Sequence, residues 1–205
     1  MTVATARSGR RRTQSERSEE MRGRLKSAAF EVVATGGLDA LRIATVAEQA
    51  GVSQGAVLHH FPNKNAITLA AVEQALELAN AESVVWDFDT DTPSLLLKAM
   101  VSEFRGFFFS DRFWVAAGIT IQHTKDTAFA AELAGRVAEL RDPIYAAWVG
   151  RLESAGWANH AGQKLVRSCA SLLSGAAIRR LWSAPDSLTD EILADWIDFA
   201  LAARG

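Results

Sequence analysis

One short segment constrains the fold of this chain more than any other, because it has the features of a helix-turn-helix. It comprises residues 43–64, IATVAEQAGVSQGAVLHHFPNK. Gly51 can supply the positive φ that a sharp turn between two helices needs, and Ser53 can cap the second helix by accepting a backbone N–H bond. Apolar residues, including Val46 and Val57, fall at spacings that bury one side of each helix. The segment therefore predicts two short helices that pack against each other across a tight turn.

The outward face predicted for the second helix favours contact with DNA. Its side chains are too polar or too small to form a core, and Gly55 and Ala56 would allow close approach to a groove. Gln54 has the donor and acceptor pair that can bind adenine, while Arg42 could reach a phosphate. The full set of predicted DNA contacts is Arg42, Thr45, Ser53, Gln54, Gly55, Ala56, His59, His60 and Lys64.

Residues 20–70, on both sides of this segment, contain further characteristic features. A first helix contains Ala28-Ala29 and ends at Gly37, Val46-Ala47 and AGVS (50–53) surround the turn, and His60-Phe61 precedes Lys64. In these positions the chain resembles the TetR/AcrR family of bacterial transcriptional regulators. Arg42 stands where the family usually has a Thr or Ser cap, and Leu58 stands where a phosphate-contacting Tyr is common. The resemblance implies a regulator, most often a repressor, whose larger body houses an inducer pocket.

Composition and charge support a small basic head on a larger acidic body. Residues 1–65 have a net charge of +4 and residues 66–205 one of −6, a split that suits a nucleic-acid-binding head, although chance variation along the chain would also produce it. The absence of a long apolar run or signal-peptide pattern predicts a cytoplasmic protein without a membrane span. Cys169, the only cysteine, lies in an apolar helical stretch and is expected to be a buried thiol.

The helical periodicity predicts an all-α protein with four sections. Residues 1–14 form a basic arm, expected to be disordered, which is either a solvated tail or a DNA-contacting extension. Residues 15–62 form the helix-turn-helix domain, with a possible capping box between Thr13 and Glu16 at its start. A connecting helix spans 63–84, and residues 85–205 form a ligand-binding and dimerisation body with helices near 94–109, 111–123, 127–154, 160–182 and 188–203. Pro143 is expected to kink the third of these body helices without ending it.

The last two predicted helices carry more apolar surface than one buried face needs. The final helix is apolar over most of its circumference, which indicates burial on two sides. The second side is either a partner subunit or the chain's own core. The homodimer hypothesis places a four-helix contact within residues 160–203, and its predicted interface residues are Leu172, Ala176, Ile192, Trp196 and Phe199.

Aromatic crowding in the body predicts either ordinary packing or a cavity between helices. Such cavities are common small-molecule sites in helical bundles. A mostly apolar effector would bind there and change the separation of two DNA-reading heads through the 63–84 helix. The predicted ligand-binding residues are Arg105, Phe108, Trp114, His123 and Trp148, with Gln122 as a further polar candidate.

No motif in the chain indicates catalysis, a cofactor or a metal. The histidines lack the spacing of metal ligands, and neither a Gly-rich phosphate loop nor a GxSxG elbow occurs. The expected partners are double-stranded operator DNA, a second copy of the chain and a small-molecule effector. A rival hypothesis keeps the DNA-binding head but assigns it a nucleoid or cell-division role. Binding sites scattered along a chromosome would favour that rival over promoter control.

Overall fold

The computed structural model describes residues 13–86, 90, 92–182 and 185–204. Within those ranges the chain forms helices and no strand, as expected for an all-α protein. The elements are α1 (Gln14–Gly36), a 3₁₀ turn (Leu38–Ala40), α2 (Ile43–Ala50), α3 (Gln54–His60), α4 (Lys64–Ala81), α5 (Pro93–Phe108), α6 (Asp111–Gln122), α7 (Thr127–Ser154), α8 (Asn159–Arg180) and α9 (Asp186–Ala202).

Local signals at its two ends define α1. The Thr13 hydroxyl accepts from the Glu16 backbone N–H at 3.2 Å, and the Glu16 carboxylate accepts from the Thr13 N–H at 2.6 Å, so the capping box is confirmed. Gly37 ends the helix with φ 73°. Gln14 is already helical, which corrects the expected disordered arm at its last two residues. Residues 1–12 of that arm lie outside the described ranges.

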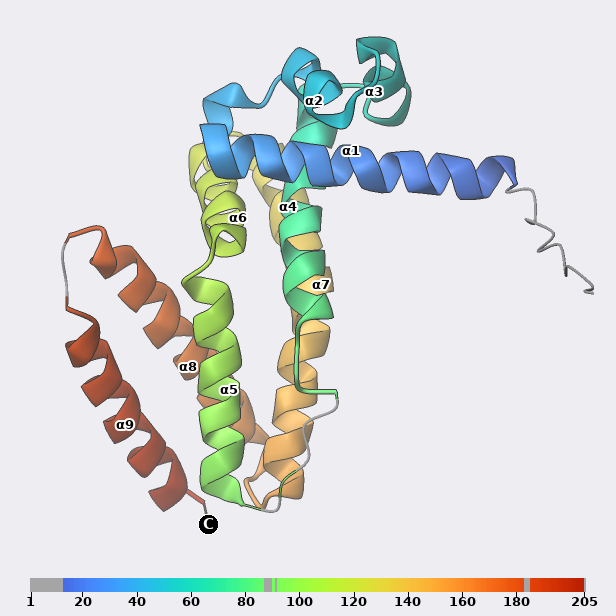
Figure 1. Cartoon of the computed structure of the whole chain (residues 1–205). Coiled ribbons are helices and arrows are strands. Elements are labelled where there is room, and N and C mark those ends of the chain that lie inside the picture. The colour runs from blue at the N-terminus through green and yellow to red at the C-terminus, as the bar shows by residue number, and fades with distance from the viewer. Residues whose placement is uncertain (1–12, 87–89, 91, 183–184, 205) are drawn as a thin grey trace, which may run out of the picture.

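The helices form a small head above a longer body (Figure 1). α1 lies across α4, α2 packs against α1, and α3 packs against α2. Leu25, Val46 and Val57 fill the space between these helices and are fully buried. In the body, α4 and α5 lie beside α7, α8 packs against both α7 and α5, and α9 packs against α5 and α8. Phe104 and Trp148 are fully buried at its centre.

The connecting helix is shorter than expected, since α4 ends at Ala81 rather than near Val84. The Glu103 carboxylate of α5 explains this difference, because it accepts from the Ser83 hydroxyl and from the Val84 N–H, both at 2.9 Å. These bonds hold the chain after α4 against α5. The body helices otherwise start and end within two residues of the predicted bounds, and α7 continues unbroken through Pro143.

A buried ion cluster joins the head to the body. The ammonium of Lys26, on α1, lies 3.1 Å from the Glu73 carboxylate of α4 and 2.5 Å from that of Glu77. Arg136 of α7 contacts the other Glu73 oxygen at 2.7 Å. Burial by itself raises the pKa of Glu73, but the hydrogen bonds and charges of Lys26 and Arg136 outweigh it and hold the pKa below its ordinary value. Three helices therefore share one ionised carboxylate.

Candidate DNA interface and effector pocket

The turn between α2 and α3 has the predicted geometry. Gly51 adopts the left-handed conformation with φ 65°, and the Val52 N–H returns to the Ala47 carbonyl at 2.9 Å. The Ser53 hydroxyl accepts from the Ala56 N–H at 3.2 Å and caps α3. Arg24 of α1 donates to the Ala50 carbonyl at 2.8 Å. The last carbonyl of α2 is thus tied to α1, which fixes the position of the turn.

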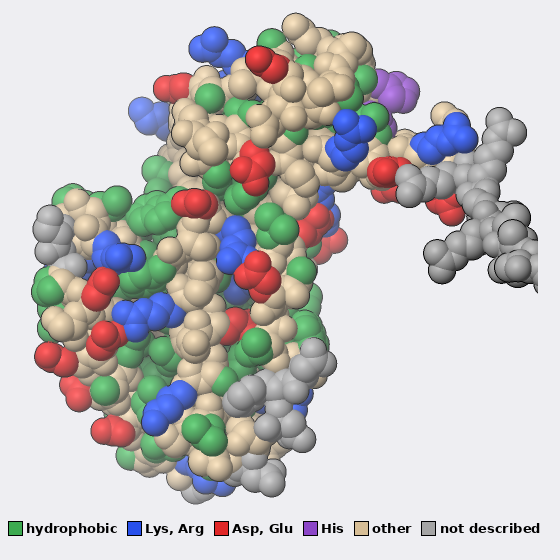
Figure 2. Space-filling view, viewed as in Figure 1, with side chains coloured by type: hydrophobic (Ala, Val, Ile, Leu, Met, Phe, Trp, Pro, Cys, Tyr) green, Lys and Arg blue, Asp and Glu red, His purple; other side chains and the backbone are tan. Residues whose placement is uncertain are grey.

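α3 presents one exposed face away from the head core. Gln54, Gly55 and His59 are exposed on it, whereas Val57 is fully buried on the other side. Figure 2 shows histidine side chains at the surface of the head on the side of α3. Among the remaining predicted DNA contacts, Arg42, Ser53 and Lys64 are exposed, and Thr45, Ala56 and His60 are half-buried. The predicted polar face is therefore present at the surface.

Leu58 is a feature of this face that the residue set predicted from sequence does not include. Its side chain is 47% exposed, although no core requires a leucine there. It follows Gln54 by four residues, so both lie on the same side of α3. An exposed leucine between polar groups could contact the methyl group of thymine in a major groove. The sequence indicates Leu58 only by its residue type, because it is a large apolar residue among outward positions that are otherwise polar or small.

His60 is held neutral at the inner edge of this face. Burial lowers its pKa below 6.5, and the nearby charges of His59 and Arg22 lower it further, while Glu19 raises it. The Arg22 guanidinium also lies 4.9 Å from the centre of the Phe61 ring, just after α3. The lowered pKa favours the neutral form of the His60 side chain.

Lys64 begins α4 directly after the α3 segment. The Asn63 side chain caps α4 by accepting from the Ala66 N–H at 2.8 Å. The Lys64 side chain is exposed, while its carbonyl accepts from the Thr68 hydroxyl at 2.8 Å. One exposed cation therefore stands on a rigid helix start beside the outward face of α3.

The predicted ligand residues lie apart in the body, except that Trp114 and Gln122 of α6 line one pocket beside the end of α1. Arg105 contacts Asp190 of α9 at 2.5 Å near the surface, and Phe108 is buried among other phenylalanines. Trp114 is half-buried on α6, and His123 bonds the Ile119 carbonyl at 2.9 Å. Trp148 is fully buried and donates to Glu103 at 3.2 Å. The aromatic crowding on which that prediction rests consists largely of ring-edge packing.

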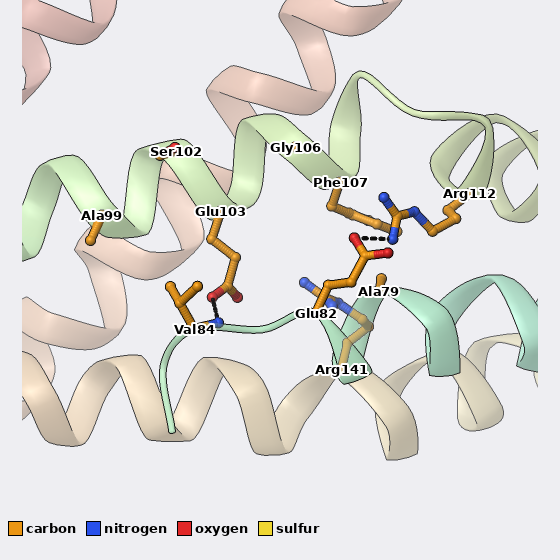
Figure 3. Close-up of a pocket in the computed structure, with 10 residues that line it drawn as sticks. All are labelled: Ala79, Glu82, Val84, Ala99, Ser102, Glu103, Gly106, Phe107, Arg112 and Arg141. Carbon is orange, nitrogen blue, oxygen red and sulfur yellow. Dashed lines mark hydrogen bonds and ion pairs between the residues drawn. The ribbon is translucent and has the colours of Figure 1, made fainter. Parts of the chain in front are cut away.

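A different pocket, of about 330 Å³, opens between α4, α5 and α7 (Figure 3). Its lining residues are Ala79, Glu82, Val84, Ala99, Ser102, Glu103, Gly106, Phe107, Arg112 and Arg141. In Figure 3 the Arg141 side chain extends from α7 into the space between α5 and the end of α4. Arg141 is only 5% exposed. A buried arginine beside small apolar side chains gives this pocket both an apolar wall and a charged anchor.

Sequence reasoning missed Arg141 although the sequence contains a signal for it. Leu133, Val137, Ile144 and Trp148 form the inward stripe of α7, and Arg141 occupies the same stripe. A charged residue in the middle of an apolar stripe is expected either to be paired internally or to line a site. Glu103 has no comparable signal, because its three bonding partners come from distant segments.

The predicted dimer residues divide into exposed and internal positions. Ile192 and Phe199 of α9 are 43% and 69% exposed, and Leu172 and Ala176 of α8 are half-buried. Trp196 is instead buried, and its ring N–H donates to the Ser168 hydroxyl of α8 at 3.0 Å. Trp196 therefore holds α9 against α8 within one subunit, which removes it from the exposed surface on which a seam was expected.

Other properties of the body concern its single thiol and its surface. Cys169 is fully buried, as predicted, and burial raises the pKa of its thiol to about 12. Among the helices that the structure describes, none is long and apolar enough to cross a membrane. In the same ranges, no three His, Cys, Asp or Glu side chains gather as metal ligands.

The fold and the site together define a helix-turn-helix DNA-binding protein with a separate helical body. The family model described as "Bacterial regulatory proteins, tetR family" matches residues 25–71. The HTH-type transcriptional regulator CymR of Pseudomonas putida is 30% identical over 175 residues, which span 85% of this chain and 86% of CymR. The chain belongs to the TetR family of transcriptional regulators.

Solved structures share the fold at lower identity. RolR in complex with resorcinol is 21% identical with a TM-score of 0.58, and the match covers 93% of this chain and 94% of RolR. The fatty acid degradation regulator FadR of Bacillus halodurans is 14% identical with a TM-score of 0.62, over 88% and 94% of the two chains. These likenesses extend the family fold through the body, beyond the matched head.

Proposed function

We propose that this regulator is a repressor that binds a pseudo-palindromic operator as a homodimer and leaves it when a small molecule binds the body. The observation that carries the proposal is the exposed face of α3, held rigidly by the Gly51 turn, the Ser53 cap and the Arg24 bond. On it Gln54 is positioned to read a base in the major groove. Arg42, Thr45, Ser53, His59, His60 and Lys64 are the proposed contacts to groove edges and phosphates, and Gly55 and Ala56 permit close approach.

The dimer rests on the apolar side chains that α8 and α9 leave exposed. Besides Ile192 and Phe199, Leu181 and Trp182 at the end of α8 are 65% and 74% exposed. A two-fold contact would bury these side chains and place two heads side by side, which makes the operator a pseudo-palindrome.

Effector control is supported by the course of α4, which runs from the head into the body. Its first residues stand beside α3, and its last turn borders the Arg141 pocket. To reverse a 99:1 population an effector needs about 5.5 kcal/mol of differential affinity, whereas about 1–3 kcal/mol gives milder coupling. Burying a few hundred Å² of apolar surface in one state only, at roughly 25 cal/mol per Å², supplies such energies.

Selection of bound duplexes from a randomised DNA library tests the operator part of the proposal. We expect one enriched pseudo-palindrome, bound by two chains or a multiple of two in native mass spectrometry. Binding without an enriched sequence contradicts the proposal and favours a nucleoid role. Binding to a single asymmetric half-site contradicts the pseudo-palindromic operator and the dimer.

Reciprocal linkage tests the effector part. An effector that weakens operator binding must bind the DNA-free protein more tightly than the operator complex, by the same factor. A ligand with equal affinity for both forms contradicts effector control by that ligand.

A further inference from the structure

The side chain of Arg141 has an unusual bonding state for a buried arginine. One terminal nitrogen, Nη1, donates to the Asn80 side-chain oxygen at 2.9 Å, while Nε, which is also buried, has no hydrogen-bond partner. No carboxylate of the described residues lies within ion-pairing distance of Arg141. Its guanidinium also makes two cation–π contacts, 4.6 Å from the centre of the Phe107 ring and 5.4 Å from that of the Tyr145 ring. A buried cation with an unbonded N–H group lowers the stability of the fold, unless an acceptor binds that group.

The unbonded part of the guanidinium has the geometry that carboxylates match. The N–H groups of Nε and Nη2 point in parallel from one edge of the planar group. Nη1 donates to Asn80 and lies away from that edge. Two parallel N–H donors form the fork that binds both oxygens of a carboxylate. Asn80 and the two rings fix the orientation of this fork, so little freedom is lost when an anion binds.

The acidic side chains that line the same pocket are already bonded to other groups. Glu103 accepts from the Ser83 hydroxyl, the Val84 N–H and the Trp148 ring N–H. Glu82 forms an ion pair with Arg112 across the pocket (Figure 3). Neither carboxylate bonds to Arg141, and Glu82 is paired with Arg112, so Arg141 is the arginine of this lining that has no carboxylate partner among the described residues.

The rest of the pocket fits a compact apolar group. Ala79, Val84 and Ala99 present apolar side chains, and a methyl group added at Gly106 would meet nothing within 4 Å. At about 330 Å³ the pocket is at the lower end of the usual range for small-molecule sites, roughly 300–1,000 Å³. We propose that Arg141 anchors an organic carboxylate with a compact apolar body, bound through the Nε and Nη2 fork. This inference names the chemical class of the effector and rests on the proposed effector function.

Calorimetry on the full chain with three probes tests the proposal. Benzoate has both the charge and the apolar body, benzamide keeps the body without the charge, and acetate keeps the charge without the body. We expect saturable benzoate binding, with benzamide and acetate each weaker by about tenfold or more. Equal affinity for benzoate and benzamide, or no saturable benzoate binding, overturns the proposal.

Variants separate anchoring from folding. R141Q should weaken benzoate by about tenfold or more and leave benzamide unchanged, whereas general damage to the pocket would weaken both. A99L keeps Arg141 but fills the pocket, so it should weaken both probes. The matched control is R167Q, because Arg167 also stacks on Tyr145, at 5.1 Å, but is exposed and pairs with Asp142.

Two results with these variants overturn the proposal. One is undiminished benzoate affinity in R141Q. The other is undiminished affinity in A99L, which decides the matter if R141Q does not fold. Operator binding is measured separately on the same protein by fluorescence anisotropy. A chain that binds its operator but not benzoate loses only this inference, and a chain that binds benzoate but no operator loses the proposed function.

Discussion

Gln54 is the residue through which α3 is expected to read sequence. Its side chain is exposed on the first turn of α3, and a glutamine amide can donate to and accept from adenine together. Replacing Gln54 by Ala should reduce discrimination at one operator position by about 1–3 kcal/mol. Competition binding with single-base operator variants measures this. Gln163→Ala on α8, also exposed, is the control; an unchanged base preference in Gln54→Ala would remove Gln54 from the readout.

Lys64 should affect affinity without affecting sequence preference. Its exposed ammonium stands at the start of α4, where the Asn63 cap fixes the backbone. Lys64→Ala should weaken binding to all duplexes by a similar factor and reduce the slope of log K against log salt by about 1, because one phosphate contact is lost. Titrations at several salt concentrations measure the slope. Lys98→Ala on α5 gives the comparison, and equal slopes for the two variants and the wild type argue against a phosphate contact.

At the scale of the elements, the Lys26–Glu73–Arg136 cluster is expected to stabilise the junction of α1, α4 and α7. Glu73→Gln removes the charge that two cations share, although Lys26 retains Glu77. The free energy of unfolding should therefore fall by about 2 kcal/mol at pH 7, less than for a fully isolated buried charge. Urea denaturation gives the value. Glu139→Gln, which changes the exposed partner of Arg136, should cost far less.

The same cluster predicts a pH dependence of stability. The pKa of Glu73 is lower in the folded than in the unfolded chain, so its contribution is complete above its ordinary pKa of 4.5 and is lost as pH falls through the folded value. The difference in unfolding free energy between the wild type and Glu73→Gln should thus shrink on acidification below that pH. Urea titrations along a pH series measure it, and a difference that stays constant would show that the ionised carboxylate is not what stabilises the junction.

At the scale of the whole molecule, Phe199 is the most informative position for the proposed dimer. It is 69% exposed on α9, so its ring contributes little to packing within one subunit. Phe199→Glu should weaken dimerisation by about 3 kcal/mol or more, over a hundredfold, because it removes apolar burial and places a charge in the seam. Sedimentation velocity over a concentration series gives the dissociation constant.

One further substitution serves as a control for that experiment, and another is unsuitable for it. Ile121→Glu on α6, at a residue 63% exposed and away from α8 and α9, is the control that should leave the dimer intact. Trp196→Glu would not serve, because Trp196 is buried against Ser168 and the change would damage the subunit itself. A Phe199→Glu protein that sediments as the wild-type dimer would place the subunit contact elsewhere.

The sequence by itself determined the features that depend on a few neighbouring residues. The Thr13 capping box, the left-handed Gly51, the Ser53 cap and the helical periods all appear as predicted. Each is a bond or backbone preference within about four residues, so the local residue types suffice. The outward face of α3 could be predicted for the same reason, since the helical period assigns sides once the turn is placed.

The tertiary structure decided which side chains meet across the body. α4 ends at Ala81 because Glu103, twenty residues further on, binds Ser83. Trp196 turns inward because Ser168 of another helix accepts its N–H, and Arg141 of α7 lines the pocket between α4 and α5. Helical periodicity predicts the face of its own helix on which a residue lies. It does not predict which other helix packs on that face, or at which turn the two helices meet. Those depend on helix crossing and on the packing of side chains far apart in the chain, which no local pattern specifies.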